Sequence, residues 1–314
     1  MSAAGAGGRR YTGRLAGALA INAVYLVVEA TAGFLTGSLV LIADAGHMLT
    51  DVAGVSLALG AIWLAQRPAN QRKTYGYYRA EVLAAFVNAL LLFAVSAYIL
   101  YEAYGRFRNP PTVPSVPVLA VASVGLAVNL LGARILAAGA AQDMNVRAAF
   151  LDMLADALGS VAAVAAGLVI LTSGWRYADP LFAAALGTFI LPRTWHLLKG
   201  ALDVLFEGTP AHIRVDDVRR AMLAVPGVRS VHDLHVWTVT SGFVALSGHI
   251  EVADGADRDD ALLATRTALH DAFGIDHMTV QVENRRLADA LDQPCLPGET
   301  PCDGEPAANV RTGP

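Results

Sequence analysis

Cysteine is nearly absent from this sequence of 314 residues, which contains only two. Both of them, Cys295 and Cys302, lie close to the C-terminal end of the chain. A fold that depends on a framework of disulfide bonds is therefore excluded. We expect the two thiols to have no structural role, although a bond between them or the binding of a soft metal ion stays open.

Charged residues are also scarce. Asp, Glu, Lys and Arg together make up 16% of the chain, whereas hydrophobic residues make up 55%. A soluble domain has about 25% charged residues, so this composition indicates a protein that crosses a membrane several times. The net charge of −4 does not suggest a nucleic-acid partner.

Six stretches of the sequence are long and apolar enough to cross a bilayer, which takes roughly 20 residues of helix. They are residues 15–35, 39–65, 80–100, 116–138, 148–171 and 178–198. The first stretch is too long for a signal peptide and another span follows it at once, so we predict that it stays in the membrane. Basic residues gather before the first span, after the second and after the sixth, which places both termini in the cytoplasm.

The composition becomes that of a soluble domain at about Glu207. Residues 214–225 and 257–273 have the periodicity of helices, while residues 228–239, 242–252 and 277–283 are typical of strands. The order α-β-β-α-β predicts an open sheet with helices on one face, an α+β domain of the ferredoxin-like type. The predicted fold class is therefore a six-transmembrane-helix bundle followed by a cytoplasmic α+β domain.

This organisation predicts four segments along the chain. They are a disordered N-terminal tail (1–10), a membrane domain (11–206), a cytoplasmic metal-binding and dimerisation domain (207–284) and a disordered C-terminal tail (285–314).

Two of the predicted spans contain ionisable side chains at the same spacing. The second span has His47 and Asp51, and the fifth has Asp152 and Asp156. Residues four apart lie on one face of a helix, so two such helices can present one imidazole and three carboxylates to a single divalent cation. Ionisable residues inside a span mark an ion path by default. This donor set suits zinc without excluding other first-row metals.

The simpler interpretation is that these residues only form hydrogen bonds within the bundle. Neither span contains a Lys or Arg deep enough to neutralise the carboxylates, and carboxylates that meet without a cation are destabilising. Two pairs in apolar surroundings therefore favour a metal site. An intramembrane metalloenzyme is not expected, because the spans contain neither a His-Glu-x-x-His helix nor a nucleophile.

Asp44 and Glu29 are two further acidic residues inside predicted spans. Asp44 lies three residues before His47 and shares roughly its helix face. It either lies on the path of the metal, supports the metal ligands, or only bonds to a neighbouring helix. Glu29 either bonds between helices or lies on a proton or ion path.

Four segments of the sequence resemble a known family: LIADAGHMLTDVAGVSLAL, YGYYRAEVLAAFVNALLL, NVRAAFLDMLADALGSV and VHDLHVWTVTSG. They are similar to the cation diffusion facilitator family, in particular its bacterial zinc, cadmium and cobalt exporters, from the first span to about Asn284. The resemblance implies a homodimeric metal/proton antiporter of the inner (plasma) membrane, with Zn²⁺ as substrate and no cofactor. It also implies a transport site made of His47, Asp51, Asp152 and Asp156.

The sequence departs at Asp152 from the pattern of the exporters that it resembles, which usually carry His there. Other branches of the family also have one His and three Asp, but with the His in the fifth span. The additional carboxylate favours metals that accept harder ligands, so manganese, iron(II) or cobalt are alternatives to zinc. A membrane protein that senses metal without transporting it is a more distant alternative.

The resemblance implies two further features of the cytoplasmic domain. One is a zinc site at the dimer interface, for which we predict His232, His249 and Glu283, with His235 as an alternative ligand; zinc bound there would regulate transport. The other is a charge pair at the domain hinge, for which Arg79 and Glu207 are the candidates. Two solvated charges, worth at most about 1 kcal/mol, are the simpler interpretation of that pair.

Overall fold

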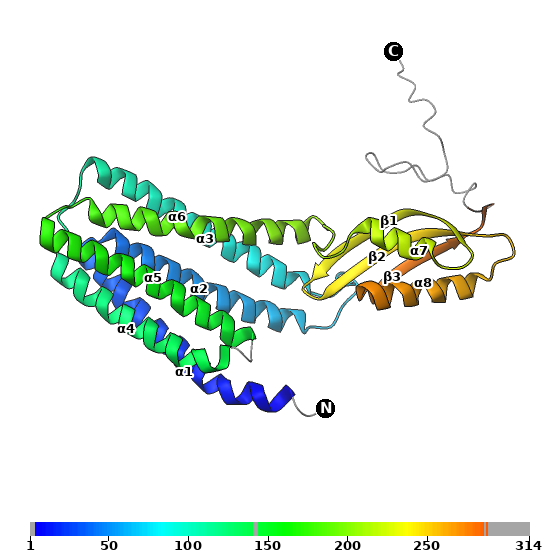
Figure 1. Ribbon diagram of the computed structural model, residues 1–314, viewed down its shortest axis with the longest axis horizontal. Coiled ribbons are helices and arrows are strands. Elements are labelled where there is room, and N and C mark those ends of the chain that lie inside the picture. The colour runs from blue at the N-terminus through cyan, green and yellow to red at the C-terminus, as the bar shows by residue number, and fades with distance from the viewer. Residues whose placement is uncertain (1–3, 141–143, 286, 288–314) are drawn as a thin grey trace, which may run out of the picture. The chain divides into compact units, whose positions relative to one another are not determined.

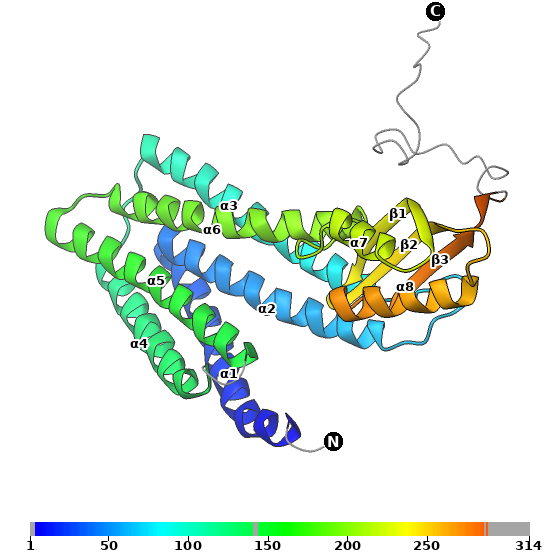
Figure 2. The same ribbon diagram turned by 45° about the vertical axis from the view of Figure 1, so that its right-hand side comes forward.

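The computed structural model describes residues 4–140, 144–285 and 287. These residues form two compact units (Figures 1 and 2). The helical unit contains the residues up to Trp63 and Ala84–Lys199, and the sheet unit contains Leu64–Leu83 and the residues from Gly200 onward. The predicted disordered tail at 285–314 falls almost entirely outside the described residues. The first helix already begins at Ala4, so residues 4–10 are helical where the sequence predicted a disordered tail.

Six long helices provide the helical unit and contain all six predicted spans. They are α1 (Ala4–Thr36), α2 (Leu39–Ala65), α3 (Arg79–Arg108), α4 (Ser115–Ala140), α5 (Met144–Ser173) and α6 (Ala178–Leu205). By length and apolar composition, α2 to α6 can each cross a membrane, and α1 contributes a shorter apolar stretch, Ala20–Thr36. The protein is therefore a helical membrane protein with five or six apolar helices.

Small side chains allow these helices to pack closely. The main core of the helical unit is rich in alanine, including Ala103 of α3, Ala122 of α4 and Ala163 of α5, all of which are buried. Such residues are common where membrane helices meet. Figures 1 and 2 show α5 running beside α4, and α1 also contacts α4. Large apolar side chains such as Phe189 remain exposed on the outside, as expected of helices that face lipid.

A buried carboxylate closes the N-terminal end of α2. Asp179, in the first turn of α6, accepts hydrogen bonds from Ser38 Oγ (2.5 Å) and from the backbone amides of Leu39 (2.7 Å) and Val40 (3.3 Å). An acid in this position satisfies amides that have no partner within the helix and interacts favourably with the helix dipole. Arg106 of α3 approaches Asp179 to 3.5 Å and donates to the carbonyl of Gly37 at 2.5 Å. This arrangement, here called the Asp179 cap, joins α2, α3 and α6.

The sheet unit contains two helices and a three-stranded sheet. Its elements in chain order are α7 (Val215–Leu223), β1 (Val228–Thr240), β2 (Phe243–Val252), α8 (Arg258–Phe273) and β3 (His277–Glu283). The strands lie in the order β1-β2-β3; β1 and β2 are antiparallel, and β2 and β3 are parallel. Helix α8 makes the crossover between the two parallel strands. It begins at the side-chain cap of Asp257 and ends at Gly274, whose φ of 65° suits glycine.

The apolar sides of the two helices and of the sheet form a separate core. Val218 and Met222 of α7, Leu246 and Ile250 of β2 and Leu269 of α8 are all buried there. This core explains why the alternating and helical patterns of the sequence correctly predict the elements of this unit.

The segment Leu64–Leu83 contains the end of α2, the connection to α3 and the first residues of α3, and it belongs to the sheet unit. The ring of Tyr75 meets that of His277 edge to face at 5.6 Å between centroids, and Tyr78 meets Phe243 in the same way at 5.6 Å. The hydroxyl of Thr240 donates to Glu81 Oε2 at 2.9 Å. The segment is therefore fixed to all three strands by aromatic and polar contacts, to β1 at Thr240, to β2 at Phe243 and to β3 at His277.

Candidate metal sites

Helices α2 and α5 bring three potential metal ligands together in the helical unit. His47 and Asp51 lie one helical turn apart on α2, with His47 Nε2 3.7 Å from Asp51 Oδ2. Together with Asp156 of α5, each of these residues offers one ligand atom, and the three atoms lie within 4.8 Å of one another. Three of the four residues predicted for the transport site therefore converge.

The surroundings of Asp156 hold its carboxylate in place and leave one oxygen available. Asn22 of α1 donates from Nδ2 to Asp156 Oδ2 at 3.0 Å. Among the described residues, neither Asp156 Oδ1 nor His47 Nδ1 has a hydrogen-bond partner, although both atoms are buried. Buried polar atoms are rarely left without partners, so their state here favours a bound cation.

Asp152, the fourth predicted ligand, is not part of this group. Its Oδ1 instead lies 3.3 Å from Nη2 of Arg193, which follows Pro192 in α6. The positive charge of Arg193 also acts on His47 and Asp51. The predicted second and fifth spans contain no basic residue deep in the membrane, but the sixth contains Arg193, and the prediction did not take it into account. The sequence does indicate such a pair, because an arginine inside an apolar span needs an acidic partner.

Asp44 is fully buried, and both of its carboxyl oxygens lack a hydrogen-bond partner among the described residues. It is not part of the group of His47, Asp51 and Asp156, and Glu29 of α1 is a neighbouring acid.

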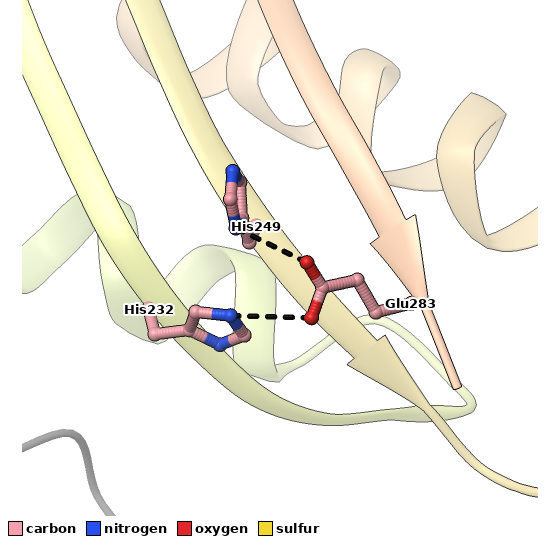
Figure 3. Close-up of side chains that lie close together, drawn as sticks. All are labelled: His232, His249 and Glu283. Carbon is pink, nitrogen blue, oxygen red and sulfur yellow. Dashed lines mark ion pairs between the residues drawn. The ribbon is translucent and has the colours of Figure 1, made fainter. Parts of the chain in front are cut away.

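A second group of three potential ligands lies on the sheet unit (Figure 3). His232 on β1 and His249 on β2 are directly opposite each other, and Glu283 is the last residue of β3. The carboxylate of Glu283 faces both rings, with Oε2 3.3 Å from His232 Nε2 and Oε1 3.1 Å from His249 Nδ1. Each residue offers one ligand atom, and these atoms lie within 4.8 Å of one another. Two imidazoles and a carboxylate are a common donor set for zinc.

His235, the alternative ligand, lies outside this group. Its Nε2 is 2.9 Å from Asp233 Oδ1, and Asp233 Oδ2 is 3.6 Å from His249 Nε2. The strand pairing is irregular between His232 and His235, and Asp233 has a positive φ of 49°. Such a bulge changes the direction of a side chain, which explains why the alternation of the sequence did not indicate that Asp233 lies beside His249.

The predicted hinge pair is present within the sheet unit. Arg79 Nη2 donates to Glu207 Oε1 at 2.7 Å. Both side chains are exposed, by 43% and 61% respectively. An exposed pair contributes about 0–1 kcal/mol, so its effect on stability is small.

Comparisons with known proteins agree with the division of the chain into a helical unit and a sheet unit. The family described as "Cation efflux transmembrane domain" matches residues 15–206, and "Cation efflux protein, cytoplasmic domain" matches residues 210–285. A protein from Alcaligenes sp. named "Cation efflux system protein CzcD" is 45% identical over 85% of this chain and 84% of its own. "Cadmium, cobalt and zinc/H(+)-K(+) antiporter" of Bacillus subtilis is 41% identical over 82% of this chain and 85% of its own.

A third relative, "Zinc transporter ZitB" of Escherichia coli, is 40% identical over 86% of this chain and 87% of its own. With identities of this size over most of the chain and both domains matched, the protein belongs to the cation efflux family, also called the cation diffusion facilitators.

Proposed function

We propose that this protein exports a divalent metal cation from the cytoplasm in exchange for protons, with zinc as its main cargo. The observation that carries the proposal is the convergence of His47, Asp51 and Asp156 between two apolar helices. The three relatives named above support it, since their names refer to cation efflux, to cadmium, cobalt and zinc, and to zinc. The carboxylate-rich donor set keeps manganese and iron(II) as alternative cargoes.

The chemistry of the ligands couples metal to protons. Deprotonated imidazole and carboxylate bind a metal ion, and the same groups release it when they are protonated. Among these ligand types, an unperturbed imidazole changes its charge nearest to neutral pH, so we assign to His47 at least one of the protons that return. Asp152 completes the site when Arg193 moves away from it. Because the ligands lie on α2 and α5, movement of these helices opens the site to one side of the membrane and then to the other.

The proposal includes the arrangement in the membrane. Six spans with both termini in the cytoplasm place the sheet unit beside the cytoplasmic metal pool. We assign residues 11–206 to the membrane domain and residues 207–284 to a ferredoxin-like cytoplasmic domain. This domain pairs with that of a second copy to form a homodimer in the bacterial inner membrane.

The experiment is a transport assay with purified protein in proteoliposomes that enclose a pH-sensitive dye. Zinc added outside is expected to enter while protons leave, and cadmium, cobalt, iron(II) and manganese are compared in the same assay. Zinc that binds without entering would point to a metal sensor and overturn the transport proposal. Faster movement of manganese or iron(II) than of zinc would overturn the choice of cargo.

Arg193 is expected to weaken metal binding, because its guanidinium occupies Asp152 and repels a divalent ion. Arg193→Gln should tighten zinc binding about tenfold. This corresponds to about 1.4 kcal/mol, a modest effect for the removal of a full positive charge beside the site. Titration calorimetry on the full-length protein measures the change. Arg108→Gln, far along α3, serves as the control and should have no effect. Unchanged or weaker binding in Arg193→Gln would contradict this role.

The site of His232, His249 and Glu283 is proposed to regulate transport. In His249→Ala, the zinc concentration that half-activates transport should rise by at least about tenfold, because even supporting groups around a metal are worth 10–100-fold. Transport at saturating zinc should remain. His270→Ala removes a histidine that pairs with Asp276 on the same unit and is the matched control. Complete loss of transport in His249→Ala would show that this site is essential and not regulatory.

A further inference from the structure

Two acidic side chains lie close together in the interior of the helical unit, and no described basic residue pairs with either of them. Glu29 of α1 and Asp44 of α2 are both 0% exposed. Their carboxyl groups are close enough to interact directly. Neither belongs to the group of His47, Asp51 and Asp156, so this carboxyl pair needs an explanation of its own.

The four oxygens of the pair accept no hydrogen bond from the part of the chain that the structure describes. A buried carboxylate without a donor is strongly destabilised. Two carboxylates that face each other cannot satisfy one another, because both are acceptors. A single proton changes this, since the protonated carboxyl donates to the other.

The groups around the pair include no fixed positive charge among the described residues. Tyr25 lies next to Glu29 on α1, but its hydroxyl donates to the carbonyl of Val121 on α4 at 3.3 Å. On α5, Ser160 lies near Asp44 and accepts a hydrogen bond from Asn129 of α4 at 3.3 Å.

Two further titratable groups complete the surroundings of the pair. Asp156 of α5 acts on both carboxyls as a further negative charge. His47 lies three residues after Asp44 on α2 and is a metal ligand in the proposed transport site.

The chain makes room for this cluster with glycine. A Cβ atom at Gly159 of α5 would lie only 2.1 Å from Asp44 Oδ1, and one at Gly125 of α4 would lie 2.0 Å from the Tyr25 hydroxyl. Any larger residue at either position would displace a polar group of the cluster. The pair therefore occupies a place that the neighbouring helices shape closely around it.

We propose that Glu29 and Asp44 share one proton and form a proton-binding site of the transporter, distinct from the metal ligands. Asp44 is on the helix that carries His47 and Asp51, and the pair lies within the field of Asp156. A divalent cation at those ligands adds positive charge beside the pair. It therefore favours release of the shared proton to water, which leaves two carboxylates, and departure of the metal favours its return. This inference rests on the proposed function only for its coupling to metal.

Infrared spectroscopy of the full-length protein tests for the proton itself. At neutral pH the wild type should show the carbonyl stretching band of a protonated carboxylic acid, and Glu29→Gln and Asp44→Asn should each lose it. Both variants keep the shape of the side chain and can donate to the remaining carboxylate, so they should fold. Asp254→Asn, an exposed loop position in the sheet unit, should keep the band. A wild type without the band would overturn the proposal even if neither variant folded.

Counting protons tests the coupling. Zinc binding to Glu29→Gln should release about one proton fewer than binding to the wild type, while zinc affinity should change less than about threefold. An unchanged proton count would overturn the coupling. Loss of one bound zinc per chain would instead assign the pair to a metal and overturn the proton site. A wild type that shows the band but transports no metal would refute the proposed function and leave the proton site standing.

Discussion

Asp156→Ala is expected to reduce metal transport in proteoliposomes to the level of liposomes without protein. The side chain is 2% exposed, contributes one of the three converging ligand atoms and is oriented by Asn22. Its removal takes away a ligand that no other described residue replaces, and it leaves the amide of Asn22 without its acceptor. We expect zinc affinity to fall at least about 100-fold, beyond the 10–100-fold typical of supporting groups.

Asn22→Ala provides a graded comparison for this prediction. It leaves all the ligands in place and removes only the hydrogen bond that orients Asp156, so zinc binding should weaken by about 10–100-fold and transport should persist at high zinc. Zinc uptake and the opposite movement of protons are measured in the same vesicles. Normal transport in Asp156→Ala would show that the assigned site does not carry the metal.

Asp179→Ala is expected to destabilise the helical unit severely. The change removes three hydrogen bonds from the N-terminal end of α2 and leaves Arg106, whose side chain is 15% exposed, without that carboxylate. Arg106 keeps its ion pair with Glu102 at 3.0 Å, so the cost comes mainly from the Ser38 hydroxyl and the two amides, each of which costs about 1–3 kcal/mol when it is left buried without an acceptor. The melting temperature of the detergent-solubilised protein, followed by tryptophan fluorescence, should fall by several degrees.

Asp179→Asn separates the contribution of charge from that of the hydrogen bonds. Its single amide oxygen, in the place of Oδ1, can still accept from Ser38 and Val40, so the melting temperature should fall less than in Asp179→Ala. Asp276→Ala removes an acid that is 81% exposed and pairs with His270, and it should leave the melting temperature unchanged. Equal melting temperatures for Asp179→Ala and the wild type would mean that the Asp179 cap does not hold α2, α3 and α6 together.

The elements of the protein are well predicted from sequence because each is specified locally. Residues 277–283 alternate and form β3 over that range, and all six apolar stretches lie within helices. α2 has the predicted bounds, but the other five helices are longer than the predicted spans, as α3 (Arg79–Arg108) shows, because hydrophobicity indicates the part that crosses lipid while the helix continues into polar sequence. The helical start at Ala4 was missed for the same reason.

The site could be predicted only in part because its geometry depends on contacts between separate helices. The i,i+4 spacing indicated that His47 and Asp51 share a face, yet it could not show that Arg193 of α6 binds Asp152. The position of Asp233 likewise depends on a bulge with a positive φ, for which alternation gives no signal. Glu29 and Asp44 were recognised as unusual, but their meeting is a property of how α1 and α2 pack.

The position of Glu283 at the end of an outer strand has a consequence for protein lifetime. β3 pairs with β2 alone, and the carboxylate of Glu283 extends across β2 to His232 of β1. An ion bound there would connect the two outer strands, β1 and β3. A ligand at 100 times its dissociation constant raises the free energy of unfolding by about 2.7 kcal/mol. Without the ion, the two outer strands should separate from β2 more often, and a protease added in vitro should then cut the sheet unit faster.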